Sequence, residues 1–231
     1  MNGLLRTLAI VGFVAVVLLG GGAYTDSAAQ VRASATLSQA PTPEEIEQDT
    51  DLAVQAVNSF WARHWSEFFT GTYKPPRVSG TYSSATGDGP TCGGRPAAVP
   101  DNAFYCATGE DFLAWDAQLM NRGAQYGDAW VYLVVAHEWG HAIQYRLDRS
   151  LTSAAPELQA DCFAGAALYG AARDGAIVFE QGDEREIMAG LSALADETPW
   201  TMQGDHGNAR QREESFGLGR SGGVTACLPT S

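Results

Sequence analysis

The chain has 231 residues, of which 45% are hydrophobic, so it can bury the core of one domain of moderate size. It carries 27 acidic and 14 basic residues, which gives a formal net charge of −13. This balance argues against nucleic-acid binding, because no basic stripe is present to displace counterions from phosphates.

The first 24 residues have the pattern of an export signal. Arg6 precedes an uncharged apolar run from Thr7 to Leu19, and three glycines follow. The run is short for a spanning helix, which needs about 20 apolar residues. Extended through Gly20–Ala23, it could serve as an uncleaved anchor. We therefore predict that residues 1–24 are a signal peptide or membrane anchor, and that the protein works outside the cytoplasm, either secreted or tethered to the membrane.

Residues 25–42 are mostly small and polar, and they predict a flexible spacer before an ordered domain at 43–231. Thr42, Pro43 and Glu45 form a helix-start signal, and a long amphipathic helix is expected from there to Gly71. His64 lies within it and is not expected to bind a metal, because nothing near it completes a site. The helix also carries five aromatic residues that we assign to the core rather than to a substrate groove: Phe60, Trp61, Trp65, Phe68 and Phe69.

Two short strands and a helix are expected next, at Arg77–Tyr82, Phe112–Trp115 and around Ala117–Tyr126. The chain contains four cysteines, which in an exported protein predict two disulfides. Three pairings are open from the sequence. A cysteine-rich zinc site is disfavoured, because no C-x-x-C pair is present.

Residues 137–141 read HEWGH, an H-E-x-x-H motif whose histidines are four residues apart. The surrounding segment, DAWVYLVVAHEWGHAIQYRL, has apolar residues at helical spacing, and Asp128 is placed to cap it. On a helix His137 and His141 share one face and can bind one Zn²⁺, while Glu138 lies beside the ion to take a proton from water. The alternative is a buried helix with two core histidines.

A second helix is expected from Pro156 to a stop at Gly175. Glu157, 16 residues after His141, is the candidate third ligand of a catalytic zinc site. Asp161 shares its helix face and could accept a hydrogen bond from a ligating histidine, which would fix the tautomer of that ring. A solvated acidic face is the alternative, and the apolar residues around both carboxylates disfavour it.

Further helices are expected at Glu184–Ala195 and within Asn208–Leu218. The predicted fold is therefore α+β: a mostly helical, zincin-like domain with a small edge sheet beside the metal-binding helix.

HEWGHAIQ followed by ELQADCFAG resembles the neutral zinc metallopeptidase family of bacteria, a group with the glutamate-zincin ligand pattern. CGG and AFYC between Cys92 and Cys106 fit in the same order, as does HGNARQREESF at residues 206–216. The similarity covers about Asn58 to Cys227. With proximity in the chain, the resemblance favours the disulfides Cys92–Cys106 and Cys162–Cys227. It also implies an edge strand that pairs with extended substrate, which we assign to Phe112–Asp116.

We therefore predict a zinc-dependent endopeptidase that acts on protein or peptide substrates. One Zn²⁺ per chain is bound by His137, His141 and Glu157, and Glu138 is the general base. The oxyanion needs a further hydrogen-bond donor. The resemblance makes His206 the first candidate, and Tyr145 is the second because it lies one helical turn beyond His141. Arg212 is expected to anchor the C-terminal element or a substrate carboxylate, and the sequence does not separate these roles.

Two alternatives remain open from the sequence. The first is a zinc amidase that acts on cell-wall peptides through the same site. The second is a non-catalytic binding protein of the cell envelope that retains zinc for structure. Structural zinc sites normally have four protein ligands, and the sequence offers three, which disfavours the second alternative.

Overall fold

The computed structural model describes residues 41–195 and 207–230. Residues 1–24, nearly all of the predicted spacer and His206 lie outside these ranges. Within them, no helix combines the length and the apolar character needed to cross a bilayer.

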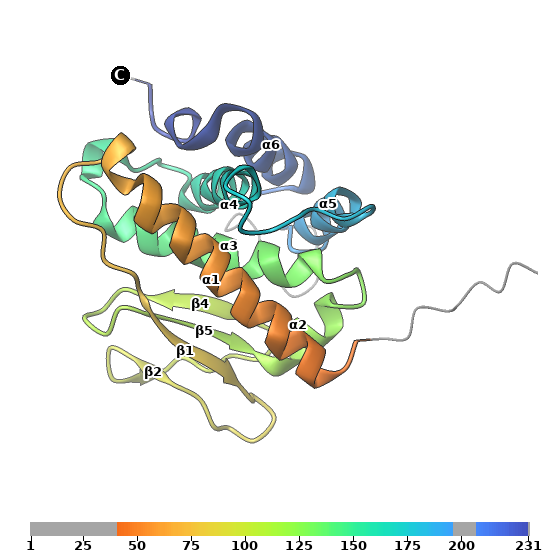
Figure 1. Ribbon diagram of the computed structural model, residues 1–231. Helices are drawn as coiled ribbons and strands as arrows, with labels where there is room; N and C mark the ends of the chain where they lie inside the picture. Colours follow the sequence, from red (N-terminus) through yellow and green to blue (C-terminus); the bar gives the residue numbers. More distant parts are fainter. Residues whose placement is uncertain (1–40, 196–206, 231) are drawn as a thin grey trace, which may run out of the picture. The chain divides into compact units, whose positions relative to one another are not determined.

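The helices are α1 (Pro43–Phe68), α2 (Ala117–Gly123), α3 (Ala129–Arg146), α4 (Pro156–Arg173), α5 (Asp183–Ala193) and α6 (Ala209–Ala226). The strands are β1 (Arg77–Tyr82), β2 (Thr91–Cys92), β3 (Arg95–Pro96), β4 (Ala103–Cys106) and β5 (Phe112–Asp116) (Figure 1). The predicted class, a mostly helical α+β domain, is confirmed.

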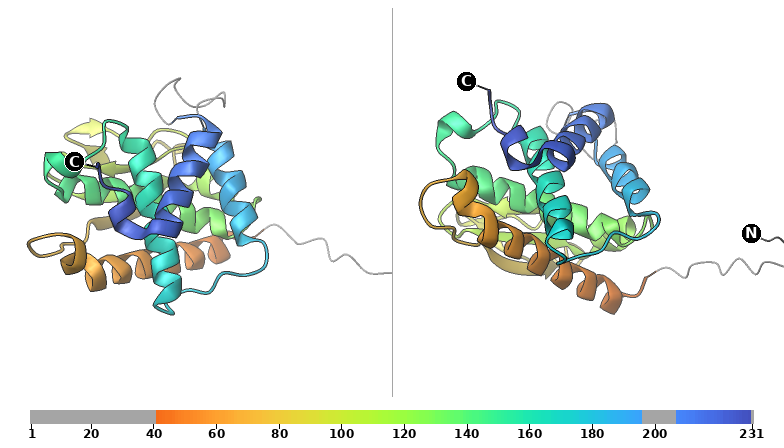
Figure 2. Two further views of the ribbon diagram at one scale, coloured as in Figure 1. Left: turned by 90° about the horizontal axis from the view of Figure 1, so that it is seen from above. Right: turned by 45° about the horizontal axis from the view of Figure 1, so that its top comes forward.

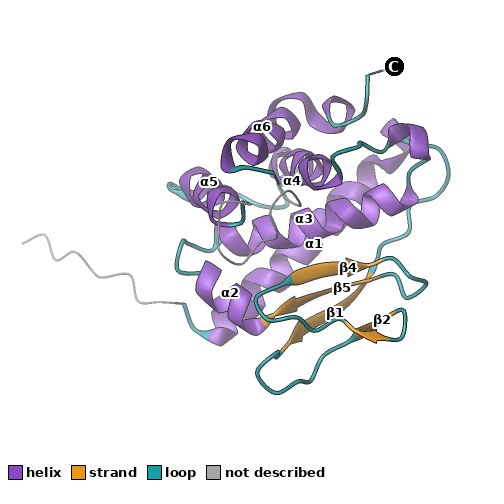
Figure 3. Ribbon diagram, turned by 180° about the vertical axis from the view of Figure 1, so that it is seen from behind, coloured by secondary structure: helices purple, strands orange, loops and turns teal. Residues whose placement is uncertain are grey.

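The main sheet has the strand order β1-β5-β4. β5 pairs in parallel with β1 and antiparallel with β4, and all five of its residues are buried. The prediction that Phe112–Asp116 is the substrate-binding edge was therefore wrong, since both edges of β5 are occupied. Its apolar run without alternation is typical of a central strand. The strand nearest α3 is β4, which among the described residues pairs with β5 alone (Figures 1 and 3).

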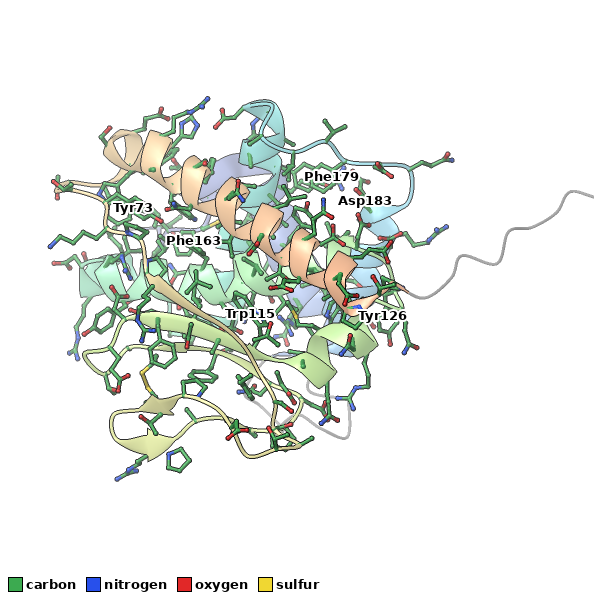
Figure 4. All side chains as sticks on the ribbon, turned by 60° about the horizontal axis from the view of Figure 1, so that its bottom comes forward. Tyr73, Trp115, Tyr126, Phe163, Phe179 and Asp183 are labelled. Atoms are coloured by element: carbon green, nitrogen blue, oxygen red, sulfur yellow. A yellow bond between two sulfur atoms is a disulfide. The ribbon has the colours of Figure 1, made fainter. Side chains whose placement is uncertain are left out.

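α1 begins as predicted, with a reciprocal capping box. The Thr42 hydroxyl accepts from the Glu45 backbone at 3.2 Å, and the Glu45 carboxylate accepts from the Thr42 backbone at 2.7 Å. The helix ends at Phe68, three residues before the expected stop. Its aromatic face is core, as predicted: Trp61 meets Phe163 of α4 edge-to-face, with ring centroids 5.7 Å apart. Phe163 is labelled in Figure 4.

His64 joins the end of α1 to the end of α4. Its Nδ1 lies 2.8 Å from Glu67 and its Nε2 lies 2.8 Å from Asp174. Burial disfavours the charged ring, but the hydrogen bonds to these two carboxylates outweigh that effect and raise the pKa of His64 above its usual value. The ring is therefore an electrostatic link between two helices.

Replacing His64 with Gln should destabilise the protein more at acid pH than at alkaline pH. A pKa raised in the folded state means that the stabilisation is fully present below the unfolded pKa of about 6.5 and is lost as pH rises through the folded pKa. Because the contacts of His64 with Glu67 and Asp174 are partly solvated, we expect the free energy of unfolding to fall by at most about 1 kcal/mol. Urea unfolding at about pH 5.5 and about pH 9 measures it. An equal loss at both pH values would contradict the assignment.

α4 and α6 pack unusually closely, and Figure 2 shows them side by side. A Cβ added at Gly219 would lie 1.8 Å from the Cys162 carbonyl oxygen. This contact explains why α6 continues to Ala226 rather than ending near Leu218. Glycines favour a helix stop when exposed, but Gly219 here faces α4, and the backbone departs from helical geometry further on, at Gly223 (φ 66°).

Two disulfides are present, Cys92–Cys106 and Cys162–Cys227, the pairing that the resemblance favoured. The first joins β2 to β4. The second joins α4 to the residue that ends α6. Together they hold the edge strand and the C-terminal helix to the rest of the domain.

The expected cap of α3 is not formed by Asp128. This residue occupies the N-cap position, but its side chain makes no cap hydrogen bond. Its backbone is already helical (φ −68°, ψ −29°), whereas capping by a side chain requires an extended N-cap residue. The carboxylate of Glu186, on α5, lies near the Ala129 backbone.

Candidate metal centre

Gly140 lies where α3 meets α4. A Cβ at this position would be 2.9 Å from both the Cα and the carbonyl oxygen of Ala160, so a side chain here would force the two helices apart. Glu157 is one helical turn before Ala160. The glycine of the HEWGH motif therefore allows the approach that places Glu157 opposite the histidines of α3.

His137, His141 and Glu157 converge on one point. The Nε2 atom of His137 is 3.2 Å from Oε2 of Glu157, and Nε2 of His141 is 3.4 Å from Oε1 of the same carboxylate. All three potential ligand atoms lie within 4.8 Å of one another. Ligands about 2.1 Å from a tetrahedral zinc ion would be about 3.4 Å apart. The donor set, two imidazoles and one carboxylate, thus fits a catalytic zinc site with one position left for water.

Asp161 and Arg212 fix the orientation of His137. Asp161 Oδ1 is 2.8 Å from Nδ1 of His137, and since a carboxylate only accepts, that nitrogen carries a proton. Nε2 is therefore the nitrogen that would bind a metal, once it has lost its own proton. Arg212 donates to both oxygens of Asp161 at 2.7 and 2.8 Å and to the Leu194 carbonyl at 2.7 Å. Of the two roles left open for Arg212, the structure favours the anchor of the C-terminal helix.

Gln144 and Gln159 support His141, and sequence reasoning missed both. Oε1 of Gln144 is 2.9 Å from Nδ1 of His141, while its amide nitrogen donates to the Pro156 carbonyl at 2.7 Å and to Gln159 at 3.1 Å. The amide oxygen only accepts, so Nδ1 of His141 is also protonated and its Nε2 faces Glu157. A polar residue three positions after a candidate ligand was the available signal.

The charges of the three converging residues depend strongly on one another. Burial disfavours the charged form of His137, but the Asp161 carboxylate outweighs it and raises the pKa of His137 to about 10. Burial also opposes the charge on Glu157, yet hydrogen bonds from the two imidazoles hold the pKa of its carboxyl group well below its usual range. A negative charge is therefore present where a cation would be bound, and binding requires the imidazoles to lose their extra protons.

Replacing Gln144 with Ala should weaken zinc binding by roughly 10- to 100-fold, because His141 would lose the partner that fixes its tautomer. Competition with a chromophoric chelator measures the affinity. Gln125→Ala, an exposed glutamine away from the site, is the matched control. An affinity equal to that of the control would show that the hydrogen bond does not position the ring.

An open cleft of about 590 Å³ lies over the three converging residues. One wall is β4 and the adjoining residue Ala107, and the other is formed by α3 and the start of α4. Glu138 lines the cleft and is 7% exposed. Tyr145 also lines it, with 59% of its surface exposed and its ring 5.9 Å from that of Tyr105. The other candidate donor, His206, is outside the described residues.

A mostly helical α+β domain with an H-E-x-x-H helix, and with a carboxylate brought to it by a second helix, has the architecture of a zinc metallopeptidase. The chain belongs to the family described as "Putative neutral zinc metallopeptidase", whose sequence profile matches residues 4–227. The resemblance noted in the sequence is thus confirmed.

Two curated proteins of Escherichia coli are similar to this chain, one from strain K12 and one from O6:H1 strain CFT073. Both are described as "Uncharacterized protein YpfJ". Each is 29% identical to this chain in an alignment that covers 83% of this chain and 73% of the relative. No solved structure matches the chain significantly. Family membership supports zinc as the metal and peptide hydrolysis as the class of reaction.

Proposed function

We propose that this protein is a zinc-dependent endopeptidase that hydrolyses protein or peptide substrates outside the cytoplasm. The observation that carries the proposal is the convergence of His137, His141 and Glu157 at the floor of an open cleft. The second nitrogen of each imidazole has a hydrogen-bond acceptor, Asp161 for His137 and Gln144 for His141, as in metal-binding histidines. The two disulfides support an oxidising compartment.

We assign the proton transfer in this reaction to Glu138, which lines the cleft next to His137. Bound zinc would supply Lewis acidity, which lowers the pKa of a water molecule and polarises the scissile carbonyl group. Glu138 takes a proton from the water, whose oxygen bonds to the carbonyl carbon. The C–N bond then breaks, and Glu138 passes the proton to the departing nitrogen. The products are a carboxylic acid and an amine, so all atoms are accounted for.

The edge of β4 is suited to hold the substrate backbone. One edge of β4 pairs with β5, which is its only strand partner among the described residues. Three residues of β4 line the cleft: Ala103, Phe104 and Tyr105. An extended peptide can add to such an edge through main-chain hydrogen bonds. We therefore assign to β4 the role that the sequence had assigned to β5.

Tyr145 is the described residue best placed to donate to the oxyanion, because it lines the cleft one turn beyond His141. Tyr145→Phe should lower kcat by roughly 10²- to 10³-fold with little change in KM. Steady-state kinetics on a fluorogenic peptide measure both constants. An unchanged kcat would leave His206, the first candidate by resemblance, as the donor to test.

The proposed activity is tested by metal analysis of the purified protein together with digestion of casein and a peptide library. We expect about one zinc per chain and cleavage that stops when a chelator is added. Release of peptides from purified cell wall, with casein left intact, would favour the zinc amidase. A zinc-loaded protein that cleaves neither substrate would favour the binding protein.

The proposed location has a separate test. The mass of the protein recovered from culture medium and from membranes shows whether residues 1–24 are removed or retained. Recovery from the cytosol alone, with the four cysteines reduced, would contradict an extracytoplasmic function.

A further inference from the structure

Arg146, the last residue of α3, contacts several separate segments of the chain. Its Nε donates to the Lys74 carbonyl at 2.7 Å, in the segment before β1, and its Nη2 donates to both carboxylate oxygens of Asp111 at 2.8 Å, directly before β5. Its Nη1 donates to the Ala142 carbonyl of α3 at 2.6 Å and lies 3.4 Å from the Tyr105 hydroxyl of β4. One side chain thus joins the end of α3 to β4 and to the residues before β1 and β5. The proton-transfer mechanism gives it no role.

Asp111 is the acceptor at the centre of these contacts. Besides the two bonds from Arg146, its Oδ1 accepts from the Tyr105 hydroxyl at 2.8 Å. Burial raises the pKa of Tyr105 above its usual value of about 10, so the hydroxyl keeps its proton and donates. The backbone carbonyl of Asp111 accepts from the Arg77 N–H at 2.8 Å. Asp111 therefore links α3, β4 and the start of β1 at one point.

This link lies beside the proposed path of the substrate. Tyr105 is one of the β4 residues that line the cleft, and His141 lies on α3 five residues before Arg146. A peptide added to the edge of β4 can bring its scissile carbonyl group to the metal position only if β4 lies at the right distance from α3. The contacts of Arg146 and Asp111 with Tyr105 fix that distance at this end of the cleft.

The exposure and geometry of the Arg146–Asp111 pair favour a positioning role over a stabilising one. The side chain of Arg146 is 12% exposed and that of Asp111 is 43% exposed. An ion pair that is open to water on one side contributes little to the free energy of unfolding. Two hydrogen bonds from one guanidinium group to one carboxylate nevertheless fix the orientation of both groups.

We propose, on the basis of the function proposed above, that Arg146 and Asp111 are positioning residues, which hold Tyr105 and the edge of β4 at the distance from α3 that an extended peptide requires. Neither residue touches the reacting atoms, and both act through the edge of β4. A substrate too short to run along β4 gains nothing from this edge. The pair should therefore affect the hydrolysis of long peptides and not that of short ones.

Asp111→Asn tests this inference in the zinc-loaded protein. Asparagine has nearly the same size and tolerates the left-handed φ of +48° at this position, but it lacks the charge that pairs with Arg146. With a peptide of about eight residues, KM should rise roughly 10-fold while kcat changes little, the pattern of lost ground-state binding. With a peptide of about four residues cut at the same bond, kcat/KM should stay the same. Zinc affinity should also be unchanged. Glu110→Gln, at the exposed neighbouring residue, makes the same change of charge and is the matched control.

Tyr105→Phe is the second variant, because it removes only the hydroxyl that donates to Asp111. It should also raise KM for the long peptide, and the double variant should be no worse than Asp111→Asn alone, since both changes break the same link. Equal losses on long and short peptides, or a KM in both variants equal to that of the control, would overturn the inference alone. Absence of cleavage by the zinc-loaded wild-type protein would overturn the proposed function as well.

Discussion

Glu138→Gln is expected to abolish peptide hydrolysis while about one zinc per chain remains bound. Glu138 lines the cleft beside both histidines but is not one of the three converging residues. An amide keeps the size of the side chain but cannot accept the proton of water. We expect kcat to fall by roughly 10²- to 10⁴-fold, the usual contribution of a general base.

The measurement combines steady-state kinetics with metal analysis of the same preparation. Glu47→Gln, an exposed glutamate of α1, is the matched control and should keep full activity. Full activity in the Glu138 variant would remove the proton-transfer role. Loss of zinc together with activity would show that Glu138 acts on the metal site itself.

Glu157→Ala is expected to have the largest effect on zinc binding. It removes the only side chain that contacts the Nε2 atoms of both histidines in the described part of the chain. The remaining two imidazoles supply one ligand fewer than a catalytic zinc site requires. The affinity should therefore fall by more than the roughly 100-fold limit for residues that only support a ligand.

Asp161→Asn provides the comparison, because Asp161 contacts His137 Nδ1 and does not face the metal position. Its loss of affinity should stay within roughly 10- to 100-fold. Competition with a chromophoric chelator measures both variants, and circular dichroism checks that they fold. An unchanged affinity in Glu157→Ala would mean that another carboxylate is the third ligand.

Local features of the chain could be predicted from the sequence because neighbouring residues determine them. The Thr42 capping box, the strand at Arg77–Tyr82 and the helix that begins at Pro156 follow from side chains within a few positions of each element. The convergence of Glu157 with His137 and His141 could also be expected. Helical spacing fixes the faces of α3 and α4, and the short connection keeps the two helices together.

Pairing between distant segments could not be predicted in the same way. Whether β4 or β5 forms the edge depends on which strands meet in space, and the buried run of β5 was the only local sign. The support of His141 by Gln144 and Gln159 depends on how α3 packs against α4. The length of α6 depends on the packing of Gly219 against α4, which no pattern within α6 reveals.

The close approach of α3 and α4 at Gly140 has a consequence for metal binding. The spacing of α3 and α4 is set by backbone contact and by a core that includes α1 and α6. We therefore expect the two helices to keep this spacing without the cation, unlike small zinc modules that fold only around their metal. Removal of zinc by a chelator should therefore abolish peptide hydrolysis without unfolding the protein. Adding zinc back to the same preparation should restore the activity.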